Sequence, residues 1–173
     1  TLHAGIAGGA DIILLPEIPY DIDKIIEAIH KRAASGHGFT ILAVAEGAIS
    51  KEDAALPKKE LKEKIKKRKH PSVSYELAEQ IFQKTGIEVR ITVPGHTQRG
   101  GSPCAYDRVF ATRVGAKAAE MILEGKYGYM VAMRDGETTA VPLEEVAGKL
   151  KMVDPKCGLI KEAKTIGISF GDE

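Results

Sequence analysis

Residues 90–103 read RITVPGHTQRGGSP, and this stretch decides how the rest of the chain is interpreted. Its β-branched residues end at Pro94-Gly95, which predicts a strand that stops in a turn. His96 and Arg99 follow on a loop flanked by glycines, and the guanidinium of Arg99 offers paired donors that match a phosphate or a carboxylate. The loop therefore favours capture of a phosphorylated small molecule at a strand end. A plain turn with surface charges is the alternative.

Two further apolar runs predict the buried strands of a parallel sheet. Ile12–Leu15 and Thr40–Ala45 are short and continuous, and a carboxylate follows each of them, Glu17 after the first and Glu46 after the second. In open α/β sheets, ligands bind outside the carboxyl ends of the strands. The sequence therefore predicts an α/β fold, a Rossmann-like parallel sheet flanked by helices, with Glu46 at a ligand site. Pairing of Glu46 with a surface Lys is the alternative.

Capping and turn residues predict further helices and a hairpin in the rest of the chain. Asp21 is a suitable cap for a helix over residues 22–35, and Ser74 for a helix over residues 75–85. Asp135-Gly136 predicts the turn of a β-hairpin. The remaining expected elements are a strand over 87–93, a helix over 107–124, hairpin strands over 129–134 and 138–142, and a short helix over 143–150. Residues 152–173 carry mixed signals and are assigned no structure.

The segment Lys58–His70 is strongly basic, with seven Lys and one Arg against Glu60 and Glu63. Leu61 and Ile65 lie four residues apart, which is typical of a short amphipathic helix with a thin apolar stripe. We favour a solvated helix or a mobile excursion of the chain. A polyanion-binding patch is the alternative, but no aromatic residues interleave with the lysines to stack on nucleic-acid bases.

Length, charge and cysteine content limit the classes of protein to which the chain can belong. The 173 residues suffice for an ordinary α/β domain, and their formal charge of +1 provides no field that would attract nucleic acid or a membrane. Cys104 and Cys157 are isolated thiols without metal-binding spacing, which fits a reducing cytoplasm. No apolar run reaches the length needed to cross a bilayer. These features predict a cytoplasmic protein with no nucleic-acid or membrane partner.

A longer pattern runs through the opening stretch. Arg90 is followed by four residues, then by Gly-His-Thr-Gln-Arg-Gly-Gly over 95–101, five more residues, and Asp107-Arg108. This spacing resembles the signature of the 6-phosphofructokinases. Thr1–Glu17 and Ala43–Ala48 are also similar to that family, and the resemblance covers Thr1 to about Val146. His3-Ala4-Gly5 and Glu46-Gly47-Ala48 favour the branch whose members use either ATP or pyrophosphate.

The resemblance implies roles for the candidate site residues. Glu46, His96 and Arg99 are expected to bind fructose 6-phosphate within one subunit, whereas Arg90 is expected to reach into the site of a neighbouring subunit. A homo-oligomer, a tetramer or a dimer, is therefore implied. The implied phosphate donor is ATP or pyrophosphate, with Mg²⁺ held by ligands outside these residues. The predicted substrate-binding residues are Glu46, Arg90, His96, Thr97, Gln98 and Arg99.

Three further charged residues are interpreted with the same resemblance in view. Asp107 and Arg108 are expected to order the loop that precedes them and not to contact a ligand. Asp11 lies where some bacterial relatives carry a carboxylate near an allosteric effector. An Asp at the end of a helix is, however, more often a plain surface residue.

The resemblance also implies a division of the chain. Residues 1–98 are expected to form the C-terminal part of a sugar-phosphate domain, residues 99–147 to pack on a donor domain outside this chain, and residues 148–173 to return to the sugar domain. The family's Gly-rich donor loop and its Thr-x-Asp-x-Asp segment, which carries the catalytic base, are absent from these 173 residues. We therefore expect the C-terminal half of a glycolytic phosphotransferase, without catalytic residues of its own and inactive by itself. A non-catalytic sugar-phosphate sensor is the alternative, and nucleic-acid binding through Lys58–His70 ranks lower.

Overall fold

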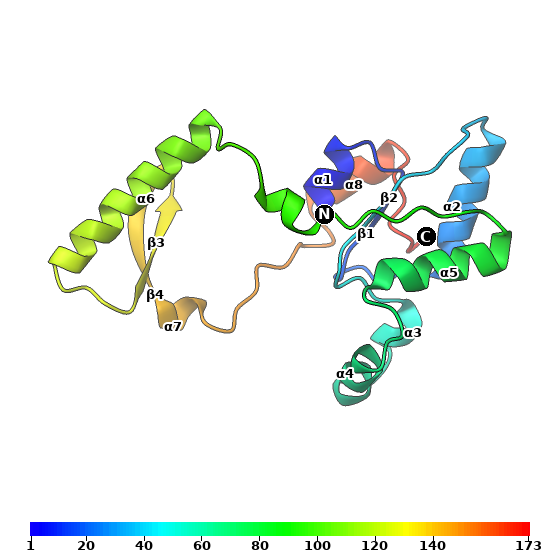
Figure 1. The fold of residues 1–173 in the computed structure, drawn as a ribbon, viewed down its shortest axis with the longest axis horizontal. Helices are drawn as coiled ribbons and strands as arrows, with labels where there is room; N and C mark the ends of the chain where they lie inside the picture. Colours follow the sequence, from blue (N-terminus) through cyan, green and yellow to red (C-terminus); the bar gives the residue numbers. More distant parts are fainter. The chain divides into compact units, whose positions relative to one another are not determined.

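The computed structural model describes residues 1–173 and divides them into two compact units (Figure 1). Unit 1 comprises Thr1–Thr92 together with Met152–Glu173, and unit 2 comprises Val93–Lys151. Unit 1 is therefore discontinuous in sequence. The predicted assignment of residues 1–98, 99–147 and 148–173 to a sugar domain, a donor-facing segment and a returning tail stays a prediction.

Two parallel strands form the centre of unit 1. β1 (Ile12–Leu14) pairs with β2 (Leu42–Val44), and Ile12 lies opposite Leu42 in the register. On its other side Ile12 forms a parallel bridge with Ser169, close to the C-terminus. Both predicted strands are therefore confirmed, each within one or two residues of its expected ends, and the sheet is parallel as predicted.

Helices cover both faces of this sheet. Every residue of β1 is buried. Because successive side chains of a strand point to opposite faces of the sheet, those of β1 enter two different cores. One core lies against α1 (Leu2–Ala7) and α8 (Gly158–Thr165), and the other lies against α2 (Ile22–Ala34) and α5 (Val73–Thr85). The buried residues of the first core are Leu2, Ala10, Ile13, Leu15, Ile18, Ile160, Ala163 and Phe170. Those of the second are Ile12, Leu14, Tyr20, Ile25, Ile29, Ala48, Leu77 and Ile81.

Helix α1 approaches the sheet closely through a glycine. A Cβ atom on Gly5 would lie 2.7 Å from Cδ1 of Ile13 and 3.1 Å from Cβ of Ala43. Both distances are shorter than ordinary van der Waals contact between carbon atoms. The absence of a side chain at this position therefore sets how near α1 can lie to β1 and β2.

The helix caps agree in part with the sequence. The Asp21 carboxylate accepts a hydrogen bond from the Asp23 amide at 2.9 Å, which confirms the predicted start of α2. Helix α5 begins at Val73, two residues before its predicted start, and Ser72 takes the cap position without a side-chain hydrogen bond to the helix. The prediction of Ser74 as the cap is therefore wrong.

The basic segment forms a helix that is tied to unit 1 by charge. α4 (Lys58–Lys66) has no buried residue, whereas Asp53 on α3 (Lys51–Ala54) is buried and pairs with Lys64. After α4, the guanidinium of Arg68 lies 3.1 Å from Glu76. Burial, together with these nearby carboxylates, raises the pKa of Tyr20 to about 12. The predicted helix is confirmed, and part of its charge serves to anchor it.

Unit 2 is a long helix packed against a hairpin. It contains η1 (Gly95–Arg99), a 3₁₀ helix, then α6 (Ala105–Leu123), β3 (Tyr129–Arg134), β4 (Glu137–Pro142) and α7 (Leu143–Val146). Asp135 and Gly136 both have positive φ, at 51° and 81°, as a type I′ turn requires. The predicted hairpin is therefore confirmed. The predicted helix over 143–150 is too long, because Ala147 leaves helical geometry with ψ of 129°.

Two sequence predictions for unit 1 need correction. Residues 87–93 do not form a strand, because no neighbouring strand hydrogen-bonds to them. The C-terminal residues, which were assigned no structure, contain α8 and the bridge at Ser169. No helix of the chain has both the length and the apolar character that spanning a membrane requires.

Candidate functional site

Four of the predicted site residues share one short helix. Pro94 precedes η1, Gly95 has a positive φ of 50°, and the Thr97 amide donates to the Pro94 carbonyl at 2.9 Å. The Gly100 amide then donates to the Thr97 carbonyl at 3.2 Å, which closes the last turn. The structure therefore brings the following residues together on a single turn of backbone: His96, Thr97, Gln98 and Arg99.

The side chains of His96 and Arg99 lie on the same side of η1. His96 and Arg99 are three positions apart, and side chains with that spacing eclipse one another in a 3₁₀ helix. Both are exposed, and neither forms an ion pair or a side-chain hydrogen bond within the chain. An imidazole and a guanidinium that face one direction without an acidic partner form a site suited to a phosphate group.

The far end of the loop is held by the start of α6. The Asp107 carboxylate accepts a hydrogen bond from the Cys104 amide at 3.0 Å, and Arg108 Nε donates to the Pro103 carbonyl at 3.2 Å. The hydrogen bond from the Cys104 backbone lowers the pKa of Asp107. Asp107 and Arg108 thus contact backbone at the end of the loop, as expected of residues that order it, and the expectation that they contact no ligand stays a prediction.

The two strand-end carboxylates behave differently. Glu46 lies in the turn after β2, is exposed, and forms neither an ion pair nor a side-chain hydrogen bond. Glu17, after β1, is half-buried, and its Oε1 accepts a hydrogen bond from the Val153 amide at 3.0 Å. Its other oxygen is buried without a hydrogen-bond partner. Glu17 therefore holds the returning C-terminal segment, whereas Glu46 is free to contact a ligand.

Arg90 is the one predicted site residue that forms an ion pair within the chain. It lies on the extended segment Ile87–Thr92 of unit 1, its side chain is 89% exposed, and its Nε lies 3.6 Å from the Glu88 carboxylate. An ion pair this exposed contributes little to stability. Glu46 also belongs to unit 1, whereas η1 belongs to unit 2.

Asp11 has a structural function in unit 1. One of its carboxylate oxygens lies 2.8 Å from the guanidinium of Arg32, and the other accepts a hydrogen bond from the Ile41 amide at 2.8 Å. Its side chain is only 17% exposed. Asp11 is therefore not a plain surface residue, because it ties α2 and the residue before β2 to the start of β1.

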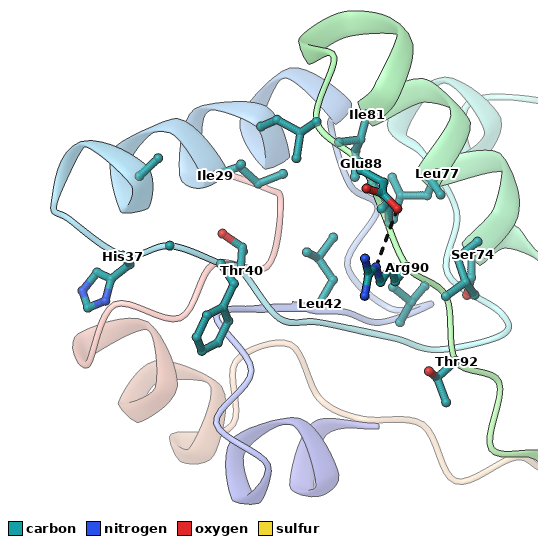
Figure 2. A pocket seen from close by; sticks show the side chains of 18 residues that line it. Ile29, His37, Thr40, Leu42, Ser74, Leu77, Ile81, Glu88, Arg90 and Thr92 are labelled. Carbon is teal, nitrogen blue, oxygen red and sulfur yellow. Dashed lines mark ion pairs between the residues drawn. The ribbon is translucent and has the colours of Figure 1, made fainter.

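The sequence did not predict a cavity that runs along β2 (Figure 2). It has a volume of about 450 Å³, and neither Glu46 nor η1 lines it. Aliphatic side chains from α2, β2 and α5 surround it, while Arg90 and Glu88 lie at one side with their ion pair (Figure 2). The signal that could have indicated it is the alternating segment Ile87–Val93, which has no obvious strand partner in the sequence.

A second cavity, of about 580 Å³, is lined mainly by charges that already have partners. Arg32 pairs with Asp11 at 2.8 Å, and Lys164 pairs with Asp172 at 2.7 Å. In addition, no group of three or more His, Cys, Asp or Glu side chains is arranged to hold a metal ion. That the ligands of Mg²⁺ lie outside these residues stays a prediction.

The fold of unit 1 and the sequence of the chain both resemble known proteins. A parallel sheet with helices on both faces is characteristic of α/β proteins that bind ligands outside the carboxyl ends of their strands. The sequence profile of the family described as Phosphofructokinase matches residues 1–122. Because this match covers more than half of the residues, the chain belongs to the phosphofructokinase family.

Related sequences support this family membership. The chain is 52% identical over 172 residues to the ATP-dependent 6-phosphofructokinase of Spirochaeta thermophila, a match that covers 99% of this chain and 47% of that protein. It is 44% identical over 173 residues to the ATP-dependent 6-phosphofructokinase of Chloroflexus aggregans, covering 100% of this chain and 47% of that protein. The chain therefore spans about half the length of the curated relatives that it matches.

Solved structures confirm the fold. Phosphofructokinase from Saccharomyces cerevisiae aligns with a TM-score of 0.62 and 28% identity, over 83% of this chain and 18% of that one. A pyrophosphate-dependent phosphofructokinase from Nitrosospira multiformis aligns with a TM-score of 0.63 and 19% identity, over 94% of this chain and 41% of that one. The predicted α/β fold, part of a phosphofructokinase fold, is therefore confirmed.

Proposed function

We propose that this chain supplies the fructose 6-phosphate site of a 6-phosphofructokinase, which transfers a phosphate from ATP or pyrophosphate to O1 of the sugar. The chain corresponds in this proposal to the C-terminal half of the enzyme, in the branch that uses either donor. The observation that carries the proposal is the unpaired placement of His96 and Arg99 on one side of η1, in a chain that belongs to the phosphofructokinase family.

The individual roles follow from the chemistry of each group. Arg99 provides paired N–H donors for the 6-phosphate, and His96 adds a third donor from the same side of η1. Thr97 and Gln98 supply uncharged hydrogen-bonding groups within the same turn. Glu46 is an acceptor for sugar hydroxyls, because its carboxylate is exposed and has no partner within the chain.

Arg90 is assigned to the site of a neighbouring subunit. Its side chain is almost fully exposed and meets only Glu88, so that little holds it in its present position. The functional form in this proposal is accordingly a homo-oligomer, a dimer or a tetramer, in which each sugar site uses residues of two subunits.

Phosphoryl transfer depends mainly on positioning and on neutralisation of charge. The residues of this chain position the acceptor sugar, while the donor and Mg²⁺ are assigned to residues outside it. No step of the transfer is assigned to a catalytic residue among these 173.

The test is formation of fructose 1,6-bisphosphate by the full-length product of the gene that encodes this chain. ATP and pyrophosphate are supplied in separate reactions with fructose 6-phosphate. Product with either donor is expected, and the donor that supports it identifies the branch. Binding of fructose 6-phosphate without product from either donor would instead identify the catalytically silent sensor. A folded protein that neither binds nor converts the sugar would overturn both.

A further inference from the structure

We propose that Pro16 and Gly47 are positioning residues, and that the contact between them sets where the Glu46 carboxylate lies in the sugar site. The inference rests on the proposed function, because that proposal assigns Glu46 to the hydroxyls of fructose 6-phosphate. Three features of unit 1 carry it: matching turns at the ends of β1 and β2, the close approach of these turns, and the attachment of each turn to the rest of the unit.

The first feature is that β1 and β2 end in the same kind of turn. In each turn the amide of the fourth residue donates to the carbonyl of the first, at 3.2 Å in residues 15–18 and at 3.0 Å in residues 45–48. The central residues are Pro16-Glu17 in the first turn and Glu46-Gly47 in the second. Because β1 and β2 are neighbouring parallel strands, both turns leave the sheet at the same edge.

The second feature is the close approach of the two turns. A Cβ atom on Gly47 would lie 3.1 Å from Cγ and 3.6 Å from Cβ of Pro16. The first distance is shorter than ordinary van der Waals contact between carbon atoms, whereas the second lies within it. Gly47 does not adopt positive φ, so its backbone conformation does not itself require a glycine. The Pro16 ring is therefore the group that favours glycine at position 47.

The third feature is that both turns are attached to the rest of unit 1. Glu17 Oε1 accepts a hydrogen bond from the Val153 amide at 3.0 Å, which ties the first turn to the returning C-terminal segment. Ala48 ends the second turn and is completely buried in the core beside α2 and α5. The ring of Pro16 also restricts its own backbone. Neither turn is therefore free to move away from the other.

This packing determines the position of Glu46, because nothing else in the chain restrains its side chain. Glu46 is exposed and forms neither an ion pair nor a side-chain hydrogen bond. A methyl group at position 47 would require Pro16 or the second turn to shift by a few tenths of an ångström. Hydrogen bonds from sugar hydroxyls to a carboxylate are sensitive to shifts of this size. Pro16 and Gly47 thus act on sugar binding through Glu46.

The experiment measures KM and kcat for fructose 6-phosphate in the full-length product of the gene that encodes this chain. Gly47→Ala should raise KM roughly fivefold or more and change kcat less than about twofold, because it weakens sugar binding and alters no group that transfers phosphate. Pro16→Ala leaves a gap beside Gly47 and should raise KM by a smaller factor. The two substitutions combined should return KM to within about twofold of the native value, because the remaining Cβ–Cβ distance of 3.6 Å is an ordinary contact.

A second pair of substitutions and a matched control separate positioning from a general disturbance of the fold. Glu46→Ala should raise KM roughly tenfold or more, and the addition of Gly47→Ala should raise it no further, because the carboxylate that Gly47 positions is then absent. Gly38→Ala is the control, since Gly38 is an exposed glycine of the same unit without positive φ and without an atom within 4 Å of a built Cβ. It should leave KM unchanged.

An unchanged KM in Gly47→Ala, with a raised KM in Glu46→Ala, would overturn this inference and leave the proposed function intact. A rise that Pro16→Ala does not reverse, or that persists without the Glu46 carboxylate, would also overturn it. An unchanged KM in Glu46→Ala would remove Glu46 from the sugar site and overturn the inference together with that part of the proposed function.

Two provisions keep the test decisive. If Gly47→Ala does not fold, Pro16→Ala and the combined variant still decide, because loss of the ring must raise KM and the added methyl group must lower it again. If the native protein binds fructose 6-phosphate without converting it, Kd takes the place of KM in every comparison. A native protein that neither binds nor converts the sugar would overturn the proposed function and this inference with it.

Discussion

At the scale of single residues, the candidate site depends on His96 and Arg99. Most charged side chains near the core of unit 1 have partners, as Asp11 has Arg32 and Lys164 has Asp172. The imidazole of His96 and the guanidinium of Arg99 have none. In the proposed function, the imidazole and the guanidinium are unpaired within the chain because they bind the phosphate of the sugar.

Arg99→Ala in the full-length enzyme should raise KM for fructose 6-phosphate at least tenfold, a loss of about 1.4 kcal/mol of binding. The reason is loss of the bidentate donor to the 6-phosphate. Steady-state kinetics at varied concentrations of fructose 6-phosphate measure this KM. Arg134→Ala is the matched control, because Arg134 is an exposed arginine of the same unit and forms no ion pair. An unchanged KM for Arg99→Ala would remove Arg99 from the site.

Asp107 gives a prediction about pH. Its pKa is lowered in the folded chain by the hydrogen bond from the Cys104 backbone, so its stabilising effect is fully present above the ordinary Asp pKa of about 3.9 and is lost as pH falls below it. The first turn of α6 should therefore fray on acidification below about pH 4. Exchange of the Cys104 amide measures this. In Asp107→Ala, which has no acceptor at this position, the amide should exchange rapidly even at neutral pH, and slow exchange there would contradict the proposed role.

At the scale of elements, the packing of α1 on the sheet depends on Gly5. Gly5→Ala gains helix propensity but places a methyl group 2.7 Å from the buried side chain of Ile13. We expect overpacking to dominate, with a net loss of about 1–2 kcal/mol in the free energy of unfolding. Urea unfolding of the chain measures it.

Gly38→Ala is the control for this substitution. Gly38 is exposed, lies in the same unit, has no atom within 4 Å of a built Cβ, and does not adopt positive φ. Its replacement should change the free energy of unfolding by less than about 0.5 kcal/mol. Equal effects of the two substitutions would show that α1 does not need its close approach to the sheet.

The success of the sequence predictions also differs by element. Apolar runs predicted β1 and β2, Asp21 predicted the start of α2, and Asp135-Gly136 predicted the hairpin, because each signal is local. Residues 87–93 have an equally good strand pattern but form no strand, since a ladder needs a neighbour that local sequence cannot provide. The same limit applies to Glu17, whose partner at Val153 is 136 residues away.

Sequence spacing alone could predict only the part of the candidate site that lies in the loop around η1. The spacing of His96 and Arg99 could be read directly, and η1 places both on one turn. Where Glu46 and Arg90 act cannot be deduced from spacing, because they lie on other segments, in unit 1. Their roles rest on the resemblance to 6-phosphofructokinases and remain predictions.

At the scale of the whole molecule, the assignment of Arg90 to a neighbouring subunit can be tested with mixed oligomers. Arg90→Ala and Arg99→Ala enzymes should each be impaired alone. Refolded together in equal amounts as dimers, they should recover roughly one quarter of native activity, because half of the dimers are mixed and each mixed dimer has one intact site. Activity assays before and after mixing measure this. No recovery would place Arg90 in the site of its own subunit.

The 173-residue chain alone should form no fructose 1,6-bisphosphate with either donor, because transfer requires a positioned donor that these residues do not hold. A coupled assay for the product measures this, with the full-length enzyme as the positive control. Product from the isolated chain would contradict the proposal that this chain binds only the sugar phosphate while residues outside it bind the phosphate donor.

The discontinuity of unit 1 has a consequence for how the protein is made. Ile160, Phe170 and the bridge from Ser169 to Ile12 complete the core around β1, yet they are separated from it by all of unit 2. During translation, α6 and its hairpin emerge from the ribosome as a local unit before α8 is synthesised. Until then, α8 does not cover the apolar surface of β1. A nascent chain that stalls before Met152 therefore leaves the first core exposed to solvent, and chaperone binding should be strongest over that interval of synthesis.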